Sequence, residues 1–326
     1  MERARIFDAG GDELLGILHP GNPDSCRGVL IVVGGPQYRV GSHRQFLLLA
    51  RHLAAAGVPA FRFDYRGMGD SGGAMRDFER VSEDIAAAID AFQQGCPEVE
   101  EVVIWGLCDA ASAALIYAWQ DRRVSGLVLA NPWVRTEEGL AKAYLKTYYR
   151  QRLFSRDLWA SLLRGRINPV ASARSLAAML RRALRGRPGP TTSSRSLAAL
   201  FRRAPGHTPQ TLQNTRDNAL PDGPLPERMA EGWKRYPGPI LLILSGDDLT
   251  AAEFLDTAAN NPAWRGLLDQ PRVTRRDLPE ANHTFSRREW RDQVAQWTLD
   301  WVLGYDDFSP GRPGRPGRSG RSGRVL

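Results

Sequence analysis

A cysteine stands where a buried strand is predicted to turn sharply into a helix. An apolar run leads to Gly106, one residue intervenes, Cys108 follows, and small residues then open a helix at Asp109. This spacing, with Ala110 in the last small place, is that of the strand–turn–helix that exposes a nucleophile at the edge of a sheet. The helix N-terminus favours a thiolate, and the neighbouring Asp109 opposes it. The segment predicts Cys108 as a nucleophile for acyl transfer; a structural thiol, or Ser112 one turn further on, is the weaker alternative.

A carboxylate and a histidine follow the cysteine in the order that such chemistry needs. Asp247 and Asp248 come directly after a predicted strand, and His283 lies in the loop before the last predicted helix. The imidazole would accept the thiol proton and the carboxylate would orient the imidazole. We expect Asp248 to be this acid, with Asp247 as the alternative and the other member of the pair capping the helix that begins at Thr250. The remaining histidines are expected at the surface or at helix ends: His19, His43, His52 and His207.

A glycine-rich loop after the first long buried strand offers donors for an oxyanion. The loop covers residues 33–38, and its Pro36 has no N–H to donate. The donor from this loop is therefore Gly35 or Gln37, and its partner is the backbone N–H of Asp109. No metal or cofactor is expected in a site of this kind.

Predicted strands alternate with helices on both sides of a long insert. The expected strands cover residues 4–7, 13–18, 28–33, 59–65, 99–105, 124–130, 239–245 and 272–278. The expected helices cover residues 43–56, 78–92, 109–119 and 286–303. This alternation predicts an α/β fold with a mostly parallel sheet and helices on both faces.

The same pattern divides the chain into three parts. We expect residues 1–132 and 236–305 to form the core, 133–235 a helical, Arg-rich cap with a partly disordered linker, and 306–326 a disordered tail of Gly, Arg and Pro. Expected helices in the insert cover residues 137–153, 157–163, 171–184 and 225–236. A ten-residue segment at 174–183 recurs at 195–204, which we interpret as a local duplication.

Charge follows the same division. The 326 residues carry a net charge of +8, but residues 150–210 contribute +12 and residues 309–326 contribute +5, which leaves −9 on the rest. The basic insert suits an anionic membrane surface, an acidic carrier or a glycan, or is a solvated face; no nucleic-acid motif accompanies it, so nucleic acid is not an expected partner.

The remaining composition excludes several classes of protein. No window approaches the roughly 18 uncharged apolar residues of a membrane-spanning helix, and no apolar run follows the N-terminus as in a signal peptide. Three cysteines without metal-ligand spacing fit a reducing cytoplasm.

The motifs together resemble the exosortase A system-associated hydrolase 1 family of the α/β-hydrolase superfamily. The likeness is carried by residues 34–46, 62–71, 105–112, 131–135 and 143–146. It implies an α/β-hydrolase fold and a bacterial cytoplasmic hydrolase encoded with machinery for exopolysaccharide production and protein sorting. A cysteine in this place also resembles dienelactone hydrolases, which implies a small activated ester or thioester as substrate rather than an amide. An acyltransferase to a sugar or lipid acceptor, and a non-catalytic scaffold, are the alternatives.

Overall fold

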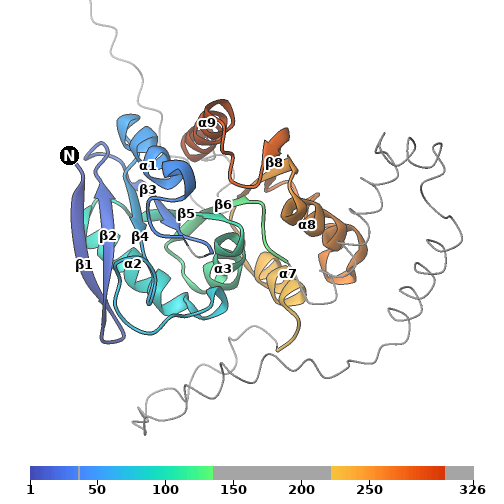
Figure 1. Cartoon of the computed structure of the whole chain (residues 1–326), viewed down its shortest axis with the longest axis horizontal. Helices are drawn as coiled ribbons and strands as arrows, with labels where there is room; N and C mark the ends of the chain where they lie inside the picture. Colours follow the sequence, from blue (N-terminus) through green and yellow to red (C-terminus); the bar gives the residue numbers. More distant parts are fainter. Residues whose placement is uncertain (36, 135–221, 305–326) are drawn as a thin grey trace, which may run out of the picture. The chain divides into compact units, whose positions relative to one another are not determined.

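Eight strands form one sheet in the order β1-β2-β4-β3-β5-β6-β7-β8 in the computed structural model, which describes residues 1–35, 37–134 and 222–304 (Figure 1). The strands are β1 (Arg3–Ala9), β2 (Asp12–His19), β3 (Arg27–Val32), β4 (Ala60–Phe63), β5 (Glu101–Leu107), β6 (Val124–Ala130), β7 (Ile240–Asp247) and β8 (Val273–Asn282). The β1–β2 and β2–β4 pairs are antiparallel, and all the other pairs are parallel. The mostly parallel sheet confirms the predicted fold class.

The strand order reverses between β3 and β5. After β3 the chain adds β4 on one side of it, and it then crosses to pair β5 with the other side. In open α/β sheets, the crevice at the carboxyl ends of the strands beside such a reversal is where ligands bind. The loop that begins at Val33 and the turn at Cys108 follow these two neighbouring strands, so the topology brings the predicted donor loop to the predicted nucleophile.

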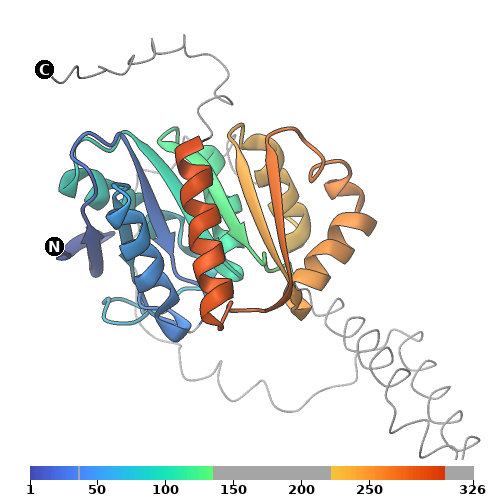
Figure 2. The same cartoon turned by 90° about the horizontal axis from the view of Figure 1, so that it is seen from above.

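Helices cover both faces of the sheet, as Figure 2 shows. Helices α1 (Gln45–Ala55) and α9 (Arg288–Gly304) pack on one face, in a core with Val29 and Ile31. The helices of the opposite face pack in a second core, with Leu30 and Val32: α2 (Ser82–Gly95), α3 (Asp109–Tyr117), α7 (Leu225–Arg235) and α8 (Leu249–Asn260). Because β3 is buried on both faces, its sequence is a continuous apolar run rather than an alternating one.

Helix α7 belongs to the packing of the core. A Cβ atom at Gly232 would lie 2.1 Å from the carbonyl oxygen of Leu115, so only glycine lets α7 approach α3 this closely. The other helices predicted for the insert, the duplicated segment and the tail lie outside the described residues. Within the described ranges, no helix is both long and apolar enough to cross a membrane.

Two predicted helices begin later than the apolar spacing indicated. His43 and Arg44 have φ values of 53° and 61°, so the backbone is left-handed just before α1 begins at Gln45. The predicted helix over 78–92 is a short 3-10 turn followed by α2, because Val81 (φ −99°, ψ 12°) departs from helical geometry between them. Both departures lie in loops at the carboxyl edge of the sheet, where tertiary contacts rather than local sequence determine the backbone conformation.

Candidate active site

Cys108 lies on a strained turn between β5 and α3. Its φ of 63° and ψ of −125° are unusual for a residue with a side chain and cost about 1–3 kcal/mol, which the surrounding structure must offset. Its backbone N–H donates to Ala130 (2.9 Å), and its carbonyl accepts from the N–H of Trp133 (3.2 Å). The side chain is half-buried. The turn therefore holds the thiol at the edge of the sheet, as the sequence pattern predicts.

Small residues allow this turn to close. A Cβ atom at Gly106 would lie 2.6 Å from the carbonyl carbon and oxygen of Ala110. Ser112, the alternative nucleophile, is fully buried and donates its hydroxyl to the carbonyl of Trp133 at 2.6 Å. The hydroxyl also lies 3.5 Å from the carbonyl oxygen of Cys108, so Ser112 supports the backbone of the turn from the buried side of α3 and is not exposed as a nucleophile.

His283 and Asp248 form the second part of the site. Nδ1 of His283 lies 2.8 Å from Oδ2 of Asp248. The Asp248 carboxylate also accepts from the N–H groups of Thr250 (3.1 Å) and Ala251 (3.2 Å), so it caps α8 as well. The two roles were predicted for different members of the Asp247–Asp248 pair, whereas Asp248 alone pairs with His283 and caps α8. Asp247 is exposed.

The tautomer of His283 follows from this arrangement. Because an ionised carboxylate can only accept hydrogen bonds, Nδ1 of the imidazole is the donor in this pair, and Nε2 is the ring nitrogen that does not face Asp248. The positive charge of His283 is also among the effects that lower the pKa of Asp109, the residue next to Cys108. The side chain of His283 is about one third exposed (31%), so it is open to a substrate.

Asn131 holds the two halves of the site together, and the sequence analysis assigned it no such role. The residue is fully buried with a φ of 43°. Its amide donates to Oγ of Ser245 (2.9 Å) and to the carbonyl oxygen of His283 (3.0 Å), and its side-chain oxygen accepts from the N–H of Ser245 (2.8 Å). An asparagine after a buried strand was the available signal, but its partners are 114 and 152 residues away in the chain.

The predicted oxyanion donor of the glycine-rich loop is already engaged. The N–H of Gly35 donates to both carboxylate oxygens of Asp109, at 2.7 and 2.8 Å. Burial raises the pKa of this carboxyl; the N–H groups of Gly35, Ala110 and Asp109 itself and the nearby His283 lower it, and the net pKa is above its ordinary value. The backbone N–H of Asp109 was the predicted donor here, whereas the structure also brings the side chain of Asp109 to the N–H of Gly35.

Hydrogen bonds to Arg39 and Gln37 hold the rest of the glycine-rich loop and the residues that follow it. The carboxylate of Asp64 is fully buried; it accepts from the N–H of Arg39 at 2.6 Å and pairs with the guanidinium of the same residue. The side-chain oxygen of Gln37, the other predicted donor residue, accepts from the N–H (2.9 Å) and hydroxyl (3.2 Å) of Ser42. These bonds anchor the loop at its centre and leave its first residues to face Asp109.

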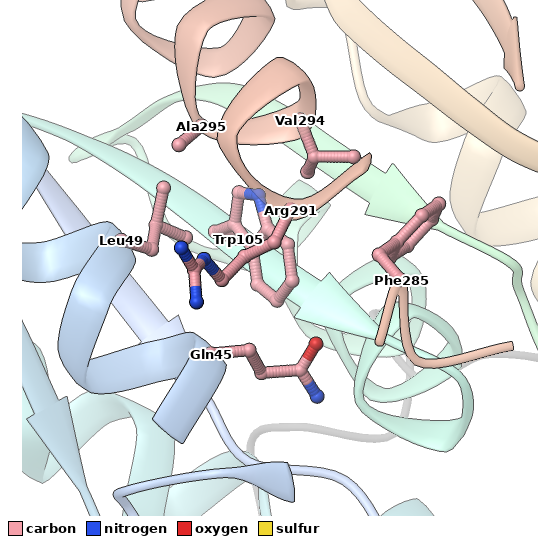
Figure 3. Close-up of a pocket in the computed structure, with 7 residues that line it drawn as sticks. All are labelled: Gln45, Leu49, Trp105, Phe285, Arg291, Val294 and Ala295. Carbon is pink, nitrogen blue, oxygen red and sulfur yellow. The ribbon is translucent and has the colours of Figure 1, made fainter. Parts of the chain in front are cut away.

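A small cavity lies behind the site, between α1 and α9 (Figure 3). Trp105 of β5 and Phe285, two residues after His283, form part of its wall, and the amide nitrogen of Gln45 is buried there without a partner among the described residues. Its volume of about 10 Å³ is room for about one water molecule, not for an acyl chain. The complete lining is Gln45, Leu49, Trp105, Phe285, Arg291, Val294 and Ala295.

The family model described as "Alpha/beta hydrolase family" matches residues 18–311, which include both parts of the site. The chain belongs to the alpha/beta hydrolase family. No curated protein matches the sequence. The broad family of the resemblance is thereby shown, and its narrower exosortase-associated branch stays a prediction.

Several solved structures share the fold of this chain. The Pyrococcus furiosus esterase Pf2001 is 14% identical, with a TM-score of 0.55 over 93% of each chain. Est1E from Butyrivibrio proteoclasticus, solved with ferulic acid bound, is 15% identical, with a TM-score of 0.54 over 92% of this chain and 98% of its own. A putative alpha/beta hydrolase from Agrobacterium tumefaciens is 16% identical, with a TM-score of 0.52 over 92% and 95%. At these identities the likeness shows the fold alone.

Proposed function

We propose that this protein hydrolyses a carboxylic ester or thioester through a covalent acyl intermediate on Cys108. The observation that carries the proposal is the pairing of His283 with Asp248 at 2.8 Å, at the carboxyl edge of the sheet where Cys108 occupies a strained, outward turn. A structural cysteine needs neither the left-handed backbone nor an oriented imidazole nearby. A nucleophile needs both.

The chemistry follows from the position of the protons. Nε2 of His283 accepts the thiol proton, and the thiolate of Cys108 forms a bond to the carbonyl carbon while one C=O electron pair moves to the oxygen. The N–H of Asp109, with that of Gly35 or Gln37, holds the oxyanion. Collapse expels the alcohol or thiol, which takes the proton from His283. Water then loses a proton to His283 and attacks the acyl carbon, and Cys108 leaves as the thiol.

The substrate class is a small acyl compound. The Pyrococcus furiosus relative is an esterase and Est1E holds ferulic acid, which supports a compact carboxylic ester as the acyl donor. The cysteine favours an activated ester or a thioester over an amide. We further place the enzyme in the cytoplasm, in the service of exopolysaccharide and exosortase function, on the strength of the resemblance at residues 34–46 and 105–112. The Arg-rich insert is the part of the chain proposed to contact an anionic glycan or membrane.

Intact-mass measurement on a panel of short nitrophenyl esters and acyl thioesters tests the proposal. The wild-type protein should turn over at least one class and gain the mass of one acyl group, and Cys108→Ala should lose both. Cys26→Ala is the matched control, because Cys26 is another partly exposed thiol. Activity that survives Cys108→Ala removes the assignment, and a product formed only with an added sugar acceptor identifies acyl transfer instead of hydrolysis.

A further inference from the structure

The carboxylate of Asp109 accepts a hydrogen bond from the glycine-rich loop. Both of its carboxylate oxygens lie within 2.8 Å of the N–H of Gly35. The backbone N–H groups of Ala110 and of Asp109 itself also lower the pKa of this carboxyl, against the larger effect of burial. The N–H groups of Gly35 and Asp109 are two of the donors proposed above for the oxyanion. A carboxylate on these donors has the charge and the acceptor oxygens of the tetrahedral intermediate that they would otherwise hold.

The loop is shaped to admit this side chain. A Cβ atom at Gly34 would lie 2.3 Å from Oδ1 of Asp109 and 2.5 Å from the carbonyl oxygen of Leu107, so any other residue at position 34 would collide with the carboxylate. Asp109 is also the first residue of α3, where the helix N-terminus favours an anion. The N–H of Gly35 binds the carboxylate, and the absence of a side chain at Gly34 leaves room for it.

The charge of Asp109 has few other partners. Within residues 1–35, 37–134 and 222–304, no arginine or lysine forms an ion pair with it. The ionisable groups around it are Cys108, His283 from the loop after β8, and Tyr65, whose pKa is raised well above its ordinary value by burial and by the Asp109 charge. The charge of the carboxylate is therefore stabilised by backbone N–H groups, and these are the groups that would bind the oxygen of a substrate.

We propose that the Asp109 carboxylate is an internal occupant of the oxyanion site, and that Asp109 is a positioning residue that determines which acyl donors reach Cys108. The inference rests on the proposed acyl-transfer function. A carbonyl oxygen gains the N–H of Gly35 only when the Asp109 side chain swings away. The displaced carboxylate stays beside the thiol, so an acyl group with its own carboxylate close to the carbonyl is repelled. The preferred acyl groups are neutral or cationic.

A short alkyl trifluoromethyl ketone tests this directly, because its reversible adduct with a thiol places an oxyanion in the N–H site. We compare wild type, Asp109→Asn and Asp109→Ser in the full chain, with Asp247→Asn as the control that removes an exposed carboxylate nearby. Alkylation by iodoacetamide, which needs no oxyanion site, measures the reactivity of the Cys108 thiol itself in each variant. Thermal melting shows that each variant is folded.

We expect the ketone to bind at least about tenfold more tightly to both Asp109 variants than to wild type, beyond any gain in the alkylation rate, and to bind unchanged to Asp247→Asn. The preference for a butyryl over a succinyl ester should shrink in the same two variants. Ketone affinity that rises no more than the alkylation rate, or does not rise, overturns the inference. Failure of the proposed function is a different result: ester turnover that survives Cys108→Ala.

Discussion

The side-chain amide of Asn131 donates to the main-chain carbonyl of His283 at 3.0 Å, so the end of β6 holds the loop that carries the imidazole. The same side chain makes two bonds to Ser245 of β7, and Ser245 donates its hydroxyl to the carbonyl of Asn282. The ends of three neighbouring strands are therefore tied at one buried asparagine. The position of the imidazole relative to Cys108 depends on this tie.

Replacing Asn131 should lower both stability and activity. Asn131→Ala loses three buried hydrogen bonds and places alanine at a φ of 43°, so we expect a loss of about 2–4 kcal/mol in the free energy of unfolding and a lower kcat. Urea unfolding and ester turnover measure the two effects. Asn131→Gly tolerates the φ value but lacks the bonds, so it should recover only about 1 kcal/mol. An unchanged kcat in both variants would contradict the positioning role.

Asp248→Asn should separate the two roles of this side chain. Asparagine caps a helix as well as aspartate, so the free energy of unfolding should change by less than about 1 kcal/mol. The amide, however, can donate to Nδ1 of His283 and so favour the wrong tautomer, and we expect kcat to fall at least about 100-fold. Asp247→Asn is the control, since Asp247 is exposed and next in sequence. Equal losses in the two variants would show that Asp248 does not orient the base.

Gly106→Ala should disturb the turn itself. The new Cβ atom would lie 2.6 Å from backbone atoms of Ala110, and neither β5 nor α3 can retreat without breaking its packing. We expect the free energy of unfolding, measured with urea, to fall by about 1–3 kcal/mol. Alkylation of Cys108 should also be slower. Gly223→Ala, where no atom lies within 4 Å of the added Cβ, should leave both unchanged. A fully stable Gly106→Ala protein would show that the turn is looser than its geometry indicates.

His19 should make the protein less stable in acid. Burial and the neighbouring charge of Arg62 lower the pKa of His19 to about 4, against the opposing effect of Glu2. In the unfolded chain His19 binds a proton near pH 6.5, whereas in the folded protein it does so only near pH 4. The free energy of unfolding therefore falls as the pH drops from about 6.5 to about 4. The loss should reach at most about 3 kcal/mol and then level off.

Urea unfolding between pH 7 and pH 4.5 measures this contribution. His19→Gln keeps an acceptor for Arg62, whose Nε donates to His19 at 3.0 Å, but does not titrate. The free energy of unfolding of this variant should lack the part of the pH dependence that His19 contributes. A variant of the exposed His43 should keep that part. Parallel pH curves for wild type and His19→Gln would refute the assignment.

The strands were predictable because burial on both faces of the sheet leaves a plain signal. The predicted strand over 124–130 coincides with β6, and the apolar run over 28–33 with β3 to within one residue. Burial of a polar residue gives no comparable signal. His19 was expected at the surface or a helix end and is 2% exposed, because it lies under Arg62 of the neighbouring β4 strand. Its partner is 43 residues away, beyond any local pattern.

Much the same distinction holds for the site. The spacing around Cys108 and the order of Asp248 and His283 are features of sequence, because they depend on where strands end. The direction of the Asp109 side chain is not, because it depends on the space at Gly34, 75 positions earlier in the chain, and on the donor at Gly35. The hydrogen bonds of Asn131 could not be predicted either, because its partners are also far away in the chain.

Strands β6 and β7 are adjacent and parallel, with Leu127 beside Ile240 and Ala130 beside Ile243. The two strands lie among the described residues on either side of the interval 135–221. We therefore expect a change in the length of that interval, such as the duplication at 174–183 and 195–204, to leave the strand register and the ties among Asn131, Ser245 and His283 unchanged. Variants that differ only in this interval should therefore keep the same arrangement of Asn131, Asp248 and His283.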